Sequence, residues 1–134
     1  MAWEAQQPLK DGTRVAGEDL SAAQYHFVTL EADGEVDLAD AATDKPYGVL
    51  QNNPVAGQPC EIVLIGFTKL VQSASINPGV TIGTNADGEA DAKVVGTDVT
   101  EYIVGQMVHN GGADQAIGTA VVNCVAATRA TTSD

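Results

Sequence analysis

Polar and apolar residues alternate along the chain in short runs that turn signals separate. Residues 25–30 (YHFVTL) are aromatic and β-branched, and they lead into Asp-Gly at 33–34, a pair that favours a tight hairpin because both positions accept a positive φ. Residues 35–38 then alternate polar and apolar, as a half-buried strand does. The longest apolar run, residues 61–71 (EIVLIGFTKLV), predicts a strand in which Gly66 marks a bulge or a bend.

The rest of the chain continues this pattern. Further strands are expected over residues 46–50, 80–82, 93–95, 102–108 and 117–125, and further turns over residues 52–57, 87–88 and 110–112. Helix is limited to single turns near residues 19–24 and 98–100. Short strands with turn signals at intervals of about 8–12 residues predict an all-β fold, either a small β-barrel or a β-sandwich.

The chain also repeats part of its own sequence. Residues 21–37 and 75–91, aligned at a constant offset of 54, share Ser, Ala, Asp, Gly, Glu and Asp at six positions. Two such copies are too few for a solenoid, which needs at least about three units. We therefore predict one β domain over residues 19–127, built from two pseudo-symmetric repeats of about 54 residues, 19–72 and 73–127.

The two ends of the chain lack this regular pattern. Residues 1–18 contain Pro and Gly without a sustained period and are expected to form an extended N-terminal arm, and residues 128–134 a flexible tail. The arm carries Trp3, the only tryptophan. A Trp side chain is costly to leave in water, so Trp3 is expected either to anchor on another surface or to fold back onto its own domain.

Charge excludes several classes of partner. The 18 acidic and six basic residues give a formal net charge of −12, which disfavours binding to nucleic acid because phosphate contacts require Lys and Arg. At 44% hydrophobic residues the chain is nevertheless suited to a packed core. We expect no membrane span, since no run of about 20 apolar residues occurs. The N-terminus lacks the pattern of a secretory signal.

Candidate metal ligands are scattered. Cys60 and Cys124 lie in apolar runs and are interpreted as buried free thiols, with a disulfide between them as the alternative. Together with His26 and His109 they lack the close spacing of a zinc site. Acidic residues alternate in both hairpins, and solvated turns are preferred to a calcium site because the 12-residue calcium-loop pattern is missing. These acidic residues are Asp33, Glu35, Asp37, Asp87, Glu89 and Asp91.

Catalytic patterns are missing as well. The serines lack a G-x-S-x-G context, and the sequence suggests no Cys–His pairing. The glycine-containing run at 79–83 has no phosphate-loop Lys. We therefore predict that the protein is not an enzyme and uses no cofactor.

Residues 19–70 place several turn and strand signals in a distinctive order. Asp-Gly at 33–34 is followed by Gly-Val-Leu-Gln-Asn at 48–52, Pro-Val-Ala-Gly at 54–57 and Glu-Ile-Val-Leu-Ile-Gly at 61–66. This order resembles that of the capsid cement, or head decoration, proteins of tailed bacteriophages. The likeness continues more weakly to about residue 125.

The resemblance implies a β-rich protein of the virion, made in the host cytoplasm, that binds the outer surface of the expanded head. There it would bridge subunits of the major capsid protein, commonly as a homotrimer. The N-terminal arm, which the resemblance does not cover, is the predicted partner-binding segment. Its candidate contact residues are Trp3, Pro8, Leu9 and Arg14.

Three alternatives compete with capsid decoration. The first is another structural part of the same particle, such as a tail or head-fibre component. The second is a carbohydrate-binding β module, although the chain offers few aromatic side chains for stacking on sugars: Trp3, Tyr25, Tyr47 and Tyr102. The third is a small hydrolase, which the missing nucleophile disfavours.

Overall fold

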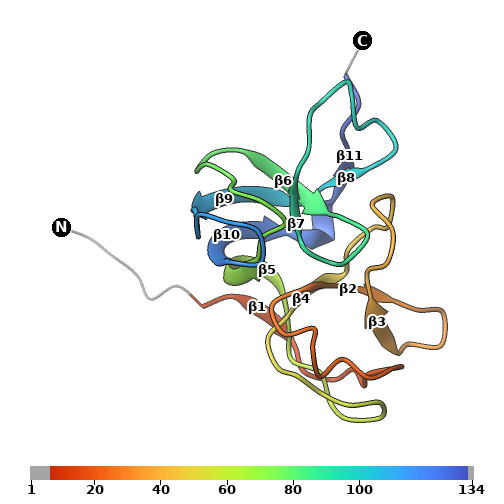
Figure 1. Ribbon diagram of the computed structural model, residues 1–134. Coiled ribbons are helices and arrows are strands. Elements are labelled where there is room, and N and C mark those ends of the chain that lie inside the picture. The colour runs from red at the N-terminus through yellow and green to blue at the C-terminus, as the bar shows by residue number, and fades with distance from the viewer. Residues whose placement is uncertain (1–6, 133–134) are drawn as a thin grey trace.

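Strands dominate the computed structural model, which describes residues 7–132 (Figure 1). The strands are β1 (Leu9–Asp11), β2 (Phe27–Leu30), β3 (Val36–Leu38), β4 (Gly48–Leu50), β5 (Ile62–Val71), β6 (Thr81–Thr84), β7 (Ala90–Ala92), β8 (Tyr102–Ile103), β9 (Gly105–His109), β10 (Ile117–Asn123) and β11 (Thr128–Arg129). One 3₁₀ turn, η1 (Cys124–Ala126), precedes β11, and no α-helix occurs between residues 7 and 132. The all-β prediction is confirmed.

A single strongly curled sheet of nine strands, a half-barrel, forms the body of the molecule (Figure 1). Eight strands follow one another in the order β3-β2-β4-β5-β10-β9-β6-β7, and β1 pairs with β5 outside this path. A separate ribbon of β8 and β11 projects from the body, at the top in Figure 1. The sheet therefore closes only partly, and its curl brings the two halves of the chain together around β5 and β10.

The two halves of the sheet share one strand order, and their hairpins share one pairing register. In the first half β2 pairs with β3 and β4, and in the second half β6 pairs with β7 and β9. Val28 pairs with Leu38, and Ile82 pairs with Ala92, so both partners in the second pair lie 54 positions later. The two hairpin registers thus follow the offset of 54, whereas Gly48 and Gly105, which pair with Val28 and Ile82, lie 57 positions apart.

β5 and β10 join the halves at the centre of the sheet. They pair antiparallel from Val71–Ile117 to Ile65–Asn123, along the full length of β10. Gly66 has a φ of +130°, which L side chains rarely adopt, and a Cβ there would lie 2.9 Å from the Pro8 side chain. Gly66 therefore has an unusual backbone conformation but no bulge, since the β5–β10 register runs through it without a shift, and its missing side chain leaves room for Pro8.

Two clusters of buried side chains form the core. The larger one lies between the two halves, and the smaller one lies within the first half. The larger cluster contains Phe27, Ala39, Val49, Val63, Leu70, Ile76, Ile82, Ala90, Val104, Met107, Ala120, Val122 and Cys124. The smaller contains Ala16, Leu20, Ala23, Val28, Val36, Leu50, Cys60 and Ile62. Aliphatic residues make up most of both clusters, and Phe27 is the largest side chain in the larger one.

Short parallel bridges cover the two end strands of the curled sheet. Ala16 bridges to Val36 on β3, and Gln72 bridges to Ala90 on β7. Each bridge carries backbone hydrogen bonds, such as the one from the Gly17 N–H to the Val36 carbonyl at 2.9 Å. Both end strands therefore have partners on both of their edges.

The chain ends are more ordered than the sequence predicts. Residues 9–18 of the predicted arm belong to the domain, because β1 pairs with β5 and Ala16 is fully buried. Residues 128–130 of the predicted tail are likewise anchored: β11 pairs with β8, and Ala130 is fully buried. Only residues 1–6 and 133–134 lie outside the described part.

Candidate functional site

Of the four residues predicted to bind a partner, the three that the structure describes lie in two places. Trp3 lies outside the described residues. Pro8 and Leu9 lie at the start of β1, where Leu9 pairs with Ile65 of β5 and is 53% exposed. Arg14 lies beyond the end of β1, where its Nε donates to the Asp11 carboxylate at 3.2 Å. The structure thus keeps Pro8 and Leu9 together and separates Arg14 from them.

Pro8 and Leu9 line an open groove on the outer face of the sheet. Its volume is about 380 Å³. The opposite wall comes from β5 and β10, and Phe67 on that wall is 51% exposed. The lining residues are Gln7, Pro8, Leu9, Ile65, Gly66, Phe67 and Val121. Apart from that of Gln7, every side chain in the lining is apolar, so the groove can bind an apolar side chain.

The outer face stays apolar because of how β5 pairs. Phe67 lies opposite Val121 in the β5–β10 ladder, and Ile65 takes part in pairs with both β1 and β10. Side chains alternate between the faces of a strand, so residues 65 and 67 point to the same side. β5 carries apolar residues on both of its faces, and the core covers only one of them.

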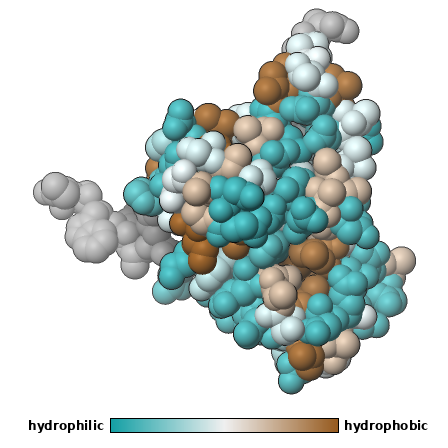
Figure 2. All heavy atoms as spheres, viewed as in Figure 1, coloured by the Kyte–Doolittle hydropathy of each residue, from teal (hydrophilic) through white to brown (hydrophobic). Residues whose placement is uncertain are grey.

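A second shallow groove continues the first. It shares Ile65 and Val121 with the first groove and has a volume of about 450 Å³. Its remaining lining comes from β6, β9, β10 and the residue before β9: Thr81, Val104, Gly105, Gln106, Val122 and Asn123. Figure 2 shows apolar atoms on the left of the molecule near β1 and β10, and further apolar atoms on the β8–β11 projection at the top.

Hydrogen bonds fix the N-terminal segment beside this groove. The Asp11 carboxylate accepts from the Thr13 hydroxyl at 2.6 Å and from the Tyr47 hydroxyl at 2.5 Å. These donors, the Thr13 hydroxyl first, hold the pKa of Asp11 well below its usual range. Because Tyr47 directly precedes β4, this network ties β1 to the first half of the sheet.

Acidic residues gather in a different hollow, beside β2 and β3. Its lining includes Glu18, Glu31, Asp37, Asp40 and Asp44. Burial, and after it the negative charge of Glu18, raises the pKa of Asp37. Asp37 Oδ1 is buried without a hydrogen-bond partner. Among residues 7–132, no group of three or more His, Cys, Asp or Glu side chains is arranged to hold a metal ion.

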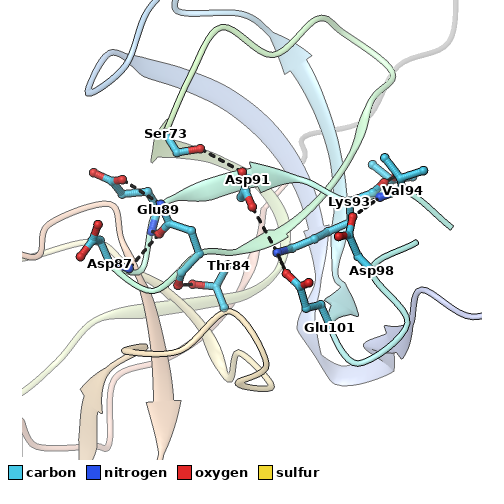
Figure 3. Close-up of polar contacts among 11 residues, drawn as sticks. Ser73, Thr84, Asp87, Glu89, Asp91, Lys93, Val94, Asp98 and Glu101 are labelled. Carbon is cyan, nitrogen blue, oxygen red and sulfur yellow. Dashed lines mark hydrogen bonds and ion pairs between the residues drawn. The ribbon is translucent and has the colours of Figure 1, made fainter. Parts of the chain in front are cut away.

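The equivalent carboxylate in the second half has partners. Asp91, 54 positions after Asp37, accepts from the Ser73 hydroxyl at 3.2 Å and from Lys93 Nζ at 3.3 Å (Figure 3). In the first half Gly17 lies beside β3 as Ser73 lies beside β7: the Gly17 N–H donates to the Val36 carbonyl and the Ser73 N–H to the Ala90 carbonyl. Gly17 has no side chain that could donate to Asp37. The carboxylates at these two equivalent positions therefore differ: that of Asp91 has hydrogen-bond donors, and Oδ1 of Asp37 has none.

Replacing Asp37 with Asn is expected to stabilise the protein at neutral pH. The folded-state pKa of Asp37 is raised above 3.8, so the stability that this group contributes is present below pH 3.8 and is lost as the pH rises through the folded pKa. The gain from Asp37→Asn should therefore be seen at pH 7 and should shrink at about pH 3. Urea unfolding at both pH values measures it. Asp91→Asn is the matched control and should destabilise at pH 7, because it weakens the bonds from Ser73 and Lys93; a gain from both substitutions would contradict the explanation.

The two cysteines are free thiols, as predicted, and each is buried in a different core cluster. Burial raises the pKa of both thiols, that of Cys124 to about 12. Protonated, inaccessible thiols of this kind act as small hydrophobic residues and have little reactivity.

Comparison with known proteins identifies a solved structure with a similar fold. No protein-family profile matches the chain, and no curated protein matches it. Its fold is similar to that of a phage head-fibre base. The match is the crystal structure of the N base of the head fibre gp8.5 in bacteriophage phi29, with a TM-score of 0.64 and 16% sequence identity, over 88% of this chain and 96% of that one. No helix among residues 7–132 is long and apolar enough to cross a membrane.

Three of the groove residues are not predicted from the sequence: Ile65, Phe67 and Val121. Each lies in a run that reads as a fully buried strand, and period-two alternation cannot tell which face of such a strand is exposed. The usable signal is that β5 and β10 are apolar on both faces, whereas a half-covered strand needs only one apolar face.

Proposed function

We propose that this chain is a structural protein of a tailed-phage virion that attaches to the outside of the head and bridges neighbouring subunits of the major capsid protein. The observation that supports this most is the fold, which is shared over nearly the full length of both chains with the base of a phage head fibre. The order of turn signals in residues 19–70, which resembles that of head decoration proteins, points to the same part of the particle.

The β8–β11 projection is the surface that we assign to the shell contact. Val94, Val95 and Val99 are exposed on the loop that leads into β8. Figure 2 shows apolar atoms on this projection, away from the body of the molecule. Exposed apolar groups gathered on one segment mark an interaction site more often than scattered ones do.

Hydrogen bonds hold the loop of the projection in a defined conformation. The Val94 N–H donates to Asp98 Oδ2 at 2.6 Å, and the Gly96 N–H donates to the Ala130 carbonyl at 2.8 Å. The first bond closes the loop on itself, and the second ties it to the chain after β11. A preformed loop loses little conformational entropy on binding.

Co-sedimentation with expanded heads that lack this protein tests the proposal. Saturable binding at a fixed ratio to the major capsid protein is expected. Val95→Asp should reduce it, because it places a charge in the apolar contact, whereas Val125→Asp, a change at an exposed valine on η1, should bind as the unmodified chain does. Folded protein that stays in the supernatant would overturn the proposal, and equal loss by both variants would overturn the role of the projection.

A head-fibre component is the second candidate, and the fold similarity favours it specifically. Electron microscopy of the reconstituted heads separates the two roles. A decoration protein would add a layer close to the shell, whereas the base of a fibre would carry an extension away from it.

Salt should slow the association of the protein with heads. The chain carries a net charge of −12, so a basic patch on the shell would attract it. Salt shortens the range of this attraction. We expect the association rate to fall as ionic strength rises from about 0.05 M to about 0.5 M, while the dissociation rate changes less. Stopped-flow light scattering measures both rates; an association rate that does not respond to salt would exclude electrostatic steering.

A further inference from the structure

We propose that Arg129 on β11 binds a carboxylate of the head shell, and that the ring of Tyr102 on β8 holds its guanidinium ready for this contact. The inference rests on the proposed function, because it names the chemistry that the β8–β11 projection recognises on its partner. The exposed valines of the projection supply apolar surface. Arg129 adds the polar contact that selects which part of the shell they meet.

Tyr102 and Arg129 lie directly opposite each other in the two-stranded ribbon at the top of Figure 1. The Cζ atom of Arg129 lies over the Tyr102 ring, 5.4 Å from its centre, and Arg129 is exposed. Side chains of a directly opposed pair lie on the same face of a ribbon. A guanidinium placed over an aromatic ring is attracted by the electrons of that ring. The ring therefore keeps the guanidinium in a defined position on the outside of the ribbon.

The stacked guanidinium keeps its hydrogen-bond donors for a partner. These N–H groups point outward along the edge of a planar fork, whereas stacking uses the face of the group. None of the four ion pairs within residues 7–132 involves Arg129. The fork matches the two oxygens of a carboxylate, to which it can donate two parallel hydrogen bonds. A carboxylate is therefore the group that this arrangement suits best.

The acidic side chains of the projection already have partners of their own. Asp98 accepts from the Val94 N–H at 2.6 Å, and Glu101 accepts from Lys93 Nζ at 2.5 Å. The described part of the projection thus offers a positive charge at Arg129, although the whole chain carries −12. Complementary charge at the contact then requires an acidic group on the shell. Nucleic acid is disfavoured as the partner, because phosphate binding depends on several Lys and Arg side chains.

Arg129 adjoins the exposed valines of the same projection. The Gly96 N–H donates to the carbonyl of Ala130, the residue after Arg129, at 2.8 Å. Gly96 directly follows Val95, which is 51% exposed. Apolar contacts around a polar one exclude water from it, and a hydrogen bond is stronger where water is excluded. The matching site on the shell is therefore an apolar hollow with a carboxylate at its rim.

Dissociation of the protein from expanded heads, followed by light scattering after dilution, tests the inference. Arg129→Gln should raise the dissociation rate at least about tenfold, because a charge-assisted bidentate contact is lost. Arg129→Lys should recover only part of this loss, since an ammonium lacks the fork. Lys69→Gln is the matched control: it removes the same charge from a cation that lies over another ring, that of Tyr25, and it should dissociate as the unmodified chain does.

The class of the partner group is tested on the heads themselves. Coupling their exposed carboxylates to glycinamide with a carbodiimide removes those charges. The unmodified chain should then leave the treated heads as fast as Arg129→Gln leaves untreated ones, and the two chains should no longer differ on treated heads. Circular dichroism of each variant shows that the fold is kept; Arg129→Lys, which retains a cation beside the ring, serves if Arg129→Gln does not fold.

Two results would overturn the inference and leave the proposed function in place. One is equal dissociation rates for Arg129→Gln and Lys69→Gln, which would mean that net charge alone matters. The other is an unmodified chain that outlasts Arg129→Gln on treated heads by the same factor as on untreated ones, which would exclude a carboxylate as the partner group. An unmodified chain that does not bind heads would overturn the proposed function and this inference with it.

Discussion

A Gly105→Ala substitution should destabilise the protein by about 3 kcal/mol, the upper end of the usual cost of overpacking. A Cβ at Gly105, the first residue of β9, would collide with the Val121 carbonyl oxygen and would lie 2.9 Å from the Val122 Cα. Both obstacles are backbone atoms of β10 in the centre of the sheet, so they cannot move aside as a flexible side chain can. Relief would require β9 and β10 to separate.

Chemical denaturation of Gly105→Ala, followed by circular dichroism, measures this loss. Gly12→Ala is the matched control, because a Cβ there meets no atom within 4 Å, and it should change the free energy of unfolding by less than about 0.5 kcal/mol. Gly48 occupies the equivalent position at the start of β4, and a Cβ there would collide with Ile62 and the Val63 carbonyl. If the Gly105→Ala and Gly12→Ala variants were equally stable, β9 and β10 would be less tightly packed than described.

Replacing Glu101 with Gln should cost about 2–3 kcal/mol, whereas replacing its partner Lys93 with Met should cost less than about 1 kcal/mol. The Lys93 side chain is 0% exposed, and its Nζ lies 2.5 Å from Glu101 and 3.3 Å from Asp91 (Figure 3). Removing the negative charge of Glu101 leaves the buried ammonium with one weaker partner. Removing the ammonium instead leaves carboxylates that are partly exposed and can be hydrated.

Urea unfolding at pH 7 compares the two variants. The expected loss in the free energy of unfolding for Glu101→Gln is smaller than for a fully buried ion pair, because water reaches both carboxylates. In the double variant, Met at 93 should recover most of the stability that Gln at 101 removes. Equal losses in both single variants would mean that the pair contributes through its own attraction and not through the cost of an unpaired buried charge.

The sequence predicts the body of the fold well because local signals determine it. Asp-Gly at 33–34 and at 87–88 marks the hairpins, and Gly34 and Gly88 both adopt the positive φ that the dipeptide favours. Gly66 likewise adopts a positive φ within the long run at 61–71. In each case a residue type accepts a backbone conformation that most others reject.

The remaining features depend on contacts between distant segments. β1 is three residues long (LKD) and shows no alternation, so only its pairing with β5 reveals it as a strand. Ala16 and Ala130 lie in mostly polar stretches of the sequence. Their complete burial depends on contacts with distant segments, to which their N–H groups donate at Gln58 and Glu101. The groove cannot be predicted for the same reason. The sequence of β5 is apolar on both faces and does not show which face the core leaves exposed.

The bridges at Ala16 and Gln72 bear on how this protein resists aggregation. An uncovered end strand offers a row of free N–H and C=O groups on which a neighbouring chain can add its own strand. Here β3 and β7, the strands that would otherwise be open, are each occupied by a short segment of their own chain. Crowded copies therefore meet an occupied backbone edge at both ends of the main path of the sheet, the places where strand addition between neighbours would otherwise start.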